Sequence, residues 1–137
     1  MESSKEFINR TKEKFSKNLE NYNSAKGKDK EKYLKWFPDI NRKGKYGFLK
    51  EGWTFMEQHN LNQKIFIVER FRRKNIIKPV THGNLKLGEV EYRVGYYMVG
   101  KNGNKIDKWT WGESCPIIPK EDFNKLINLA KKEKTIL

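Results

Sequence analysis

The stretch from Val90 to Val99 alternates, residue by residue, between two sets of side chains. One set is apolar or aromatic and the other is mixed; the first comprises Val90, Tyr92, Val94, Tyr96 and Met98, the second Glu91, Arg93, Gly95, Tyr97 and Val99. A two-residue period places the two sets on opposite faces of a β-strand. The run then meets Asn102-Gly103, a strong short-range signal for a hairpin turn. The pattern therefore predicts an antiparallel sheet centred on a hairpin at about residues 90–112.

The register of this hairpin follows if Asn102-Gly103 is a two-residue loop. Val99 then lies opposite Ile106, and Tyr96 lies opposite Trp109. This pairing puts Trp109 and Trp111 on the face of Tyr92 and Tyr96, and it puts Arg93, Tyr97, Lys108 and Thr110 on the other face. Because a sheet needs one buried face, we expect the aromatic face to form core and the Arg93 face to be open to a ligand.

Amphipathic helices are expected at both ends of the chain. Over residues 5–22, Ile8, Phe15, Leu19 and Tyr22 lie on one stripe at helical spacing, and Ser3 or Ser4 with Glu6 forms a capping signal. Over residues 120–132, the expected buried stripe is Phe123, Leu126, Ile127 and Ala130. Pro119 marks the start of that helix, and acidic residues precede basic ones in the order that suits the helix dipole.

The middle of the chain gives weaker signals. We expect a short helix through Tyr33, Leu34 and Phe37 that ends before Pro38, a loop over 39–52, a short helical turn over 53–60, a strand over 64–73, and a connection over 76–88. The predicted fold is one α+β domain over residues 1–137. It has a small antiparallel sheet of three to five strands, packed by the two terminal helices.

The charge of the chain points to a polyanionic partner. Thirty Lys and Arg residues face 17 Asp and Glu residues, which gives a formal net charge of +13. Basic residues are interleaved with rings in the stretches 32–37, 45–50, 70–74, 92–97 and 108–111. Cations neutralise phosphates while flat rings stack on bases, so nucleic acid, DNA or RNA, is the expected partner. Lysine outnumbers arginine 24 to 6, which favours phosphate contact of low sequence specificity over base reading.

Three groups of residues are the candidate nucleic-acid contacts. They are the cluster Arg70, Arg72, Arg73 and Lys74, the glycine-containing segment with Arg42, Lys43 and Lys45, and the hairpin residues Arg93, Tyr97 and Lys108. Single cations position a phosphate backbone without reading its sequence. We therefore expect a nucleic-acid-binding protein of low specificity.

Two other functions stay open. A small endonuclease or ribonuclease, of restriction or toxin type, would hold its substrate with the same surface; Glu69, Glu91 and His82 are its weak catalytic candidates, and Mg²⁺ would enter only in that case. The third is a phage- or plasmid-type inhibitor or adaptor that binds an acidic protein. No metal or cofactor motif is recognised, and the residues favour binding over catalysis.

The compartment is inferred from what the sequence lacks. Cys115 is the single cysteine, so no intramolecular disulfide forms, and we expect a buried thiol in a reducing compartment. The first six residues hold no apolar signal core, and no apolar run approaches the ~20 residues of a membrane-spanning helix. The expectation is a cytoplasmic protein with no membrane partner.

Overall fold

The chain folds around one five-stranded antiparallel sheet, seen here in a computed structural model that describes residues 1–137. The strands are β1 (Lys35–Pro38), β2 (Lys45–Gln58), β3 (Leu61–Ile77), β4 (Val90–Val99) and β5 (Trp109–Trp111). Each strand pairs with the next one along the chain, so the sheet is a meander in the order β1-β2-β3-β4-β5. The predicted α+β class, with helices at both ends, is confirmed.

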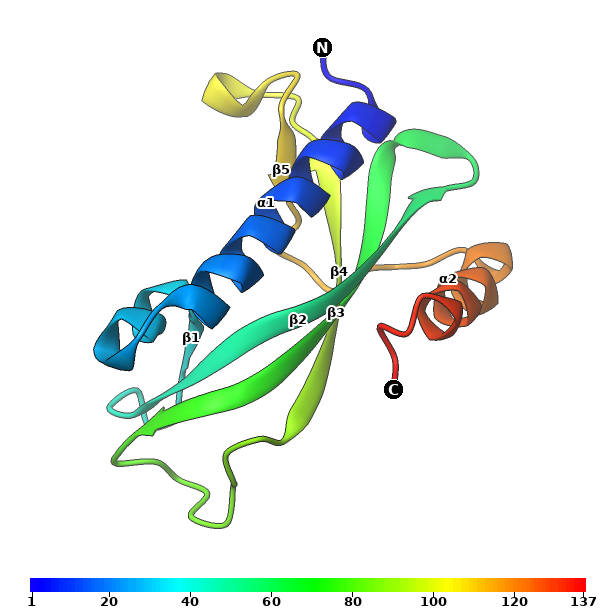
Figure 1. The fold of residues 1–137 in the computed structure, drawn as a ribbon. Coiled ribbons are helices and arrows are strands. Elements are labelled where there is room, and N and C mark those ends of the chain that lie inside the picture. The colour runs from blue at the N-terminus through cyan, green and yellow to red at the C-terminus, as the bar shows by residue number, and fades with distance from the viewer.

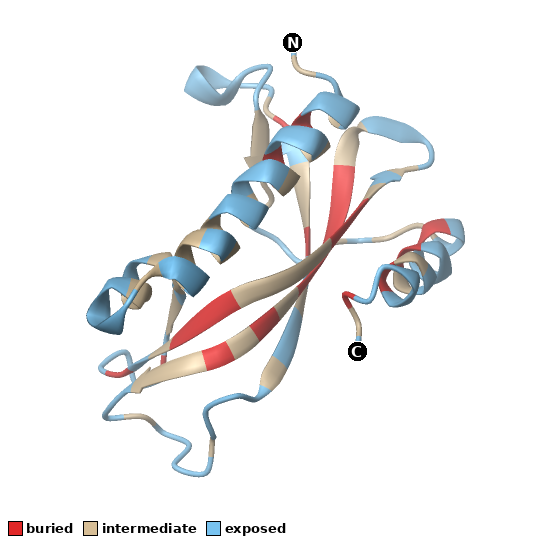
Figure 2. Cartoon of the chain, viewed as in Figure 1, coloured by how far each residue is buried: buried red, intermediate tan, exposed pale blue.

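The helices α1 (Ser4–Ser24) and α2 (Lys120–Lys132) lie on opposite sides of the twisted β2–β3 ribbon (Figure 1). The alternation of β3 explains this arrangement. Ile65 and Ile67 pack with Phe7 of α1, whereas Phe66 and Val68 pack with Leu126 and Ala130 of α2. Figure 2 shows the buried residues gathered in the central strands and on the inner sides of the helices. A central strand that is buried on both faces thus divides the core into two clusters.

Both predicted terminal helices are confirmed, and their local signals explain their bounds. Ser3 and Glu6 form the reciprocal capping box at the start of α1. The buried residues of α1 are Phe7 and Thr11, so Phe7, outside the predicted stripe, enters the core. In α2, Leu126 and Ala130 are buried, but Phe123 is 50% exposed, and its predicted burial was wrong.

The predictions for residues 33–60 were wrong except at 39–44, where the first part of the predicted loop connects β1 with β2. A 3₁₀ helix, η1 (Gly27–Tyr33), precedes strand β1 where a helix was expected, and β2 is one continuous strand where a loop and a helical turn were expected. Bulges between Gly47 and Phe48, between Lys50 and Gly52, and between Glu57 and Gln58 interrupt the pairing of β2 with β3. Only the shift between Lys50 and Gly52 leaves an extra residue, Glu51, in β2, whereas the other two leave extra residues in β3. The bulge at Glu51 breaks the two-residue period in the middle of β2, so the sequence shows no sustained alternation here. The strand predicted over 64–73 is real but longer, reaching from Leu61 to Ile77.

The predicted register of the 90–112 hairpin was also wrong. Val99 lies opposite Trp109 and Tyr97 lies opposite Trp111. The segment between the strands contains a 3₁₀ turn, η2 (Gly103–Lys105), with positive φ at Gly103 and Asp107, in place of a two-residue loop. The pairing is therefore shifted by three positions, and an odd shift moves every side chain to the other face. Trp109 and Trp111 lie on the face of Arg93 and Tyr97.

Two further expectations concern the surface. Cys115 lies in the segment before α2 and is exposed, so its predicted burial was wrong. No helix combines the length and the apolar character that crossing a membrane requires.

Candidate nucleic-acid interface

The arginine side chains are held mainly by carboxylates and carbonyls of the protein itself. Arg70 and Arg72 share Glu51, and Arg73 pairs with Glu89 and Glu91. The side chain of Arg73 is only 2% exposed. Arg10 pairs with Glu2 and Arg93 pairs with Glu69, which leaves Arg42 as the one arginine outside an ion pair. The cluster at 70–73 therefore contributes to the fold, and its role in binding stays a prediction.

The other predicted contacts lie apart from one another. Lys74 lines a small cavity with Lys28 and Lys30. Arg42, Lys43 and Lys45 are exposed on and next to the β1–β2 connection, with Lys45 over the ring of Trp36 at 4.9 Å. Lys108 is exposed just before β5. Of the ten predicted contact residues, only Arg93 and Tyr97 come together on one concave surface with further cations.

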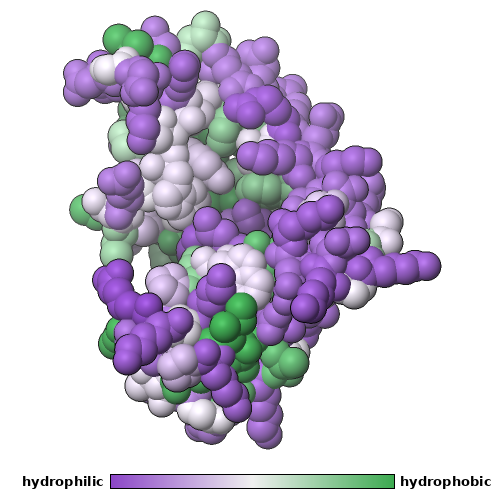
Figure 3. Space-filling model, turned by 90° about the vertical axis from the view of Figure 1, so that its left-hand side faces the viewer, coloured by the Kyte–Doolittle hydropathy of each residue, from purple (hydrophilic) through white to green (hydrophobic).

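That surface consists of two adjoining cavities of about 220 and 230 Å³, which share Lys35 and Lys50. We call it the cationic groove. Its lining contains five basic residues and no carboxylate; the basic residues are Lys14, Lys32, Lys35, Lys50 and Arg93, and the rings beside them are Phe15, Tyr33, Tyr97 and Trp111. Figure 3 views the molecule from the side of α1, where hydrophilic atoms border a hollow with paler and apolar atoms inside. A concave surface of one charge focuses the electrostatic potential and attracts anions.

A buried carboxylate beneath the groove holds two of its cations. Glu69 has no exposed side-chain surface and accepts from Arg93 Nε at 2.6 Å and from Arg93 Nη2 at 3.2 Å. Its Oε2 also lies 2.8 Å from Lys50 Nζ. Because β2, β3 and β4 supply Lys50, Glu69 and Arg93, respectively, the sheet itself sets their geometry. Glu69 neutralises part of the charge but leaves the groove with a positive surplus.

The electrostatics of the groove follow from this partial burial. Burial lowers the pKa of Lys50, the ion pair with Glu69 opposes that change, and the charges of Arg93 and Lys35 add to the decrease. Burial, together with the charge of Glu69, raises the pKa of Tyr97 to about 12. Tyr97 is therefore a neutral hydroxyl at physiological pH. An anion in the groove would favour the charged form of Lys50.

The Trp111 ring can line the groove because Gly95, which has no side chain, lets the ring lie directly against β4. The Trp111 ring lies against Gly95, where an added Cβ would come within 2.2 Å of the ring. The Arg93 guanidinium in turn lies over Trp111, 4.5 Å from the ring centroid. On the other side, Lys50 Nζ lies 3.5 Å from the centroid of Phe15 in α1. Cations and rings are thus interleaved in space, as a phosphate-and-base ligand requires.

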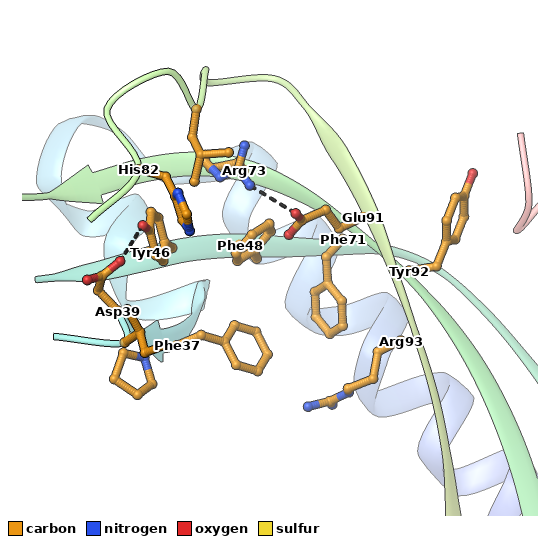
Figure 4. A pocket seen from close by; sticks show the side chains of 13 residues that line it. Phe37, Asp39, Tyr46, Phe48, Phe71, Arg73, His82, Glu91, Tyr92 and Arg93 are labelled. Atoms are coloured by element: carbon orange, nitrogen blue, oxygen red, sulfur yellow. Dashed lines mark hydrogen bonds and ion pairs between the residues drawn. The ribbon is translucent and has the colours of Figure 1, made fainter. Parts of the chain in front are cut away.

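A larger cavity of about 420 Å³ adjoins the groove at Arg93. We call it the aromatic pocket. Phe37, Phe48 and Phe71 point toward one another in it (Figure 4), with ring centroids 5.7 to 6.1 Å apart. Asp39 at one end accepts from the Tyr46 hydroxyl at 2.6 Å and from Thr81, and these hydrogen bonds, the one from Tyr46 foremost, hold its pKa well below its usual range.

The three weak catalytic candidates lie in different surroundings. Glu69 is sealed under the groove, Glu91 pairs with Arg73 at 3.2 Å, and His82 is exposed in the loop that borders the aromatic pocket. Glu69 and Glu91 therefore both pair with neighbouring cations. No group of three or more His, Cys, Asp or Glu side chains is arranged to hold a metal ion.

Sequence reasoning missed most of the groove. Lys14, Lys32, Lys35 and Lys50 were not selected as site residues, and Trp111 was assigned to the core face. The signal was present in part, because the stretches 32–37, 45–50 and 108–111 interleave cations with rings. No sequence feature indicated which of these stretches come together.

Comparison of the chain with protein-family models, with curated proteins and with solved structures finds no match.

Proposed function

We propose that this protein binds single-stranded nucleic acid in the cationic groove, with low sequence specificity. The observation that carries the proposal is the lining of the groove: five cations and four rings, with no carboxylate among them. Phosphates of a strand bind the lysines, and bases stack on the rings. Lysine is a point charge with no fixed hydrogen-bonding fork, so these contacts position the strand without reading its sequence.

The distribution of ion pairs over the whole molecule supports the same proposal. Lys50 is the one lysine of 24 that lies within 4 Å of a carboxylate, whereas five of the six arginines are paired. The lysines are therefore the cations that remain available to an external anion. The lone exposed Cys115 is compatible with a reducing compartment, and we place the activity in the cytoplasm.

The nuclease alternative has less support. A catalytic Glu69 would have to reach the substrate, but its side chain has no exposed surface and both oxygens are engaged by Arg93 and Lys50. An acidic protein would bind the lysines of the groove through charge alone, and this would leave the groove rings without a role. A comparison of polyanions separates it from nucleic acid.

The test measures affinity by fluorescence anisotropy against salt, for single-stranded and duplex oligonucleotides and for polyglutamate of matched charge. We expect the tightest binding for single strands, with a slope of log affinity on log salt of about −0.7 per phosphate contacted. Replacing Lys14, Lys32 and Lys35 by Gln should weaken binding and flatten the slope by about 0.7 for each phosphate that is no longer neutralised.

The matched control replaces three exposed lysines of α2, Lys120, Lys125 and Lys132, by Gln. The change in net charge is the same, but α2 lies on the other side of the sheet from the groove. We expect the slope of this control to equal that of the wild type. Equal losses in the two triple variants would overturn the proposed location, and tighter binding of polyglutamate than of any oligonucleotide would favour the acidic-protein alternative.

A further inference from the structure

We infer that the aromatic pocket takes one unstacked base of the bound strand, while the adjacent phosphate lies in the cationic groove at Arg93. This inference rests on the proposed function and specifies the ligand of a second, adjoining subsite. Arg93 connects the two subsites, because its side chain lines both cavities.

The size and shape of the pocket fit one flat ligand. Its volume of about 420 Å³ lies within the range of roughly 300 to 1,000 Å³ that is typical of small-ligand sites. Its walls are the rings of Phe37, Phe48 and Phe71, which come from β1, β2 and β3 (Figure 4). The rings pack edge to face, with interplanar angles of 75° to 83°. Phe48 and Phe71 are buried in the wall, so the half-buried Phe37 is the ring that is open to an aromatic guest.

The charge of the pocket separates it from the groove. Its lining contains two arginines, Arg73 and Arg93, and two carboxylates, Asp39 and Glu91. Arg73 pairs with Glu91, and Arg93 pairs with Glu69 beneath. Because these charges are balanced, the pocket attracts a second phosphate only weakly. It suits the neutral, planar part of a nucleotide, which is the base. The adjoining surplus of cations in the groove is where the phosphate belongs.

The guanidinium groups extend the aromatic walls. Arg93 lies 5.2 Å from the centroid of Phe71 and 5.5 Å from that of Phe37, and Arg73 lies 5.2 Å from that of Phe48. The Arg73 side chain is only 2% exposed and is closed to a ligand, whereas the Arg93 side chain is 31% exposed and presents a further flat surface on which a base stacks. The same guanidinium of Arg93 reaches over Trp111 in the groove at 4.5 Å. One side chain thus links the base subsite to the phosphate subsite.

Polar groups that edge the pocket are available to the rim of a base. Glu91 is 58% exposed at its side chain, and His82 is exposed in the loop between β3 and β4. Asp39, in contrast, is occupied by Tyr46, Thr81 and Asn41. Glu91 and His82 are therefore the polar groups that can contact the edge of a base in the pocket.

The experiment compares an intact single strand with an abasic strand of the same length, which keeps the phosphates and lacks the bases. We expect the wild type to bind the intact strand at least about 10-fold more tightly than the abasic strand. Phe37→Leu keeps an apolar side chain on the edge strand but removes the ring. It should weaken binding of the intact strand several-fold, leave the abasic strand unaffected, and leave the salt slope unchanged.

Phe123→Leu is the control for loss of a ring, because Phe123 is exposed on α2. It should behave as the wild type does, and circular dichroism confirms that both variants are folded. If Phe37→Leu weakens binding of both strands equally, the base subsite is wrong while the groove stands. If the wild type binds the two strands equally, base stacking fails in the pocket and on the groove rings alike, and only the phosphate contacts stand. If neither strand binds in a salt-dependent way, the proposed function itself fails.

Discussion

Arg93 and Glu69 form a two-point ion pair across neighbouring strands, with Arg93 Nε and Nη2 lying 2.6 and 3.2 Å from the two carboxylate oxygens. The two residues are direct partners in the β3–β4 register. Glu69 also holds Lys50 at 2.8 Å, so one carboxylate positions two cations of the groove. The pair therefore links the stability of the sheet to the geometry of the candidate site.

Removal of the Glu69 carboxylate should strongly destabilise the fold. Glu69→Ala leaves Lys50 and Arg93 without their buried partner, and we expect the free energy of unfolding to fall by on the order of 3 kcal/mol. The control is Glu2→Ala, since Glu2 pairs with Arg10, whose side chain is 58% exposed, and a surface pair contributes at most about 1 kcal/mol. Urea denaturation of both variants makes the comparison. Equal losses in the two variants would show that the buried pair has no special role.

Binding should depend on pH through Lys50. Burial lowers the pKa of Lys50, and a phosphate nearby favours its protonated form, so affinity should begin to fall with rising pH below the ordinary lysine pKa of about 10.4. Lys50→Arg stays charged throughout and should give a flatter profile. Lys35→Arg, at an exposed position of the groove, should keep the wild-type profile. Anisotropy titrations at each pH measure this, and identical profiles for the wild type and Lys50→Arg would count against the assignment.

Arg70 should affect stability and not binding. Its Nη1 donates to the carbonyls of Lys134 and Thr135 at 2.7 and 3.0 Å, which fastens the segment after α2 to β3. Arg70→Ala should lower the free energy of unfolding by on the order of 2 kcal/mol. The unpaired, exposed Arg42 is the control, and Arg42→Ala should stay within about 0.5 kcal/mol of the wild type. If folded Arg70→Ala showed a flatter dependence of nucleic-acid affinity on salt, Arg70 would be a phosphate contact after all.

Gly95 should be intolerant of a side chain. A Cβ at this position would lie 2.2 to 3.0 Å from ring atoms of Trp111, so Gly95→Ala must displace the ring. We expect a loss of about 1 to 3 kcal/mol and a shifted indole N–H resonance for Trp111. Gly83→Ala, which meets nothing within 4 Å, should be close to neutral. An unmoved indole resonance in Gly95→Ala would contradict this packing.

The predictable parts of the fold are those whose signals are local. The helix α1 follows from its apolar spacing and the Ser3–Glu6 box, and α2 runs over the predicted residues Lys120–Lys132. The strand β4 follows from its alternation. The strand β2 was not predicted because a bulge at Glu51 breaks its two-residue period. The predicted face of Trp111 was wrong because a turn with positive φ at Gly103 and Asp107 shifts the register.

Local patterns in the sequence are enough to establish a basic α+β protein with helices at both ends, a strand at 90–99 and a large surplus of lysine. They do not determine which cations act together. Lys14, Lys35, Lys50 and Arg93 come from α1, β1, β2 and β4, and they meet only where those elements pack around the sheet. Periodicity and capping are signals that extend over a few residues, so they predict single helices and strands. The site depends on which strands are neighbours, on their register, and on Glu69, which pairs with Lys50 and Arg93.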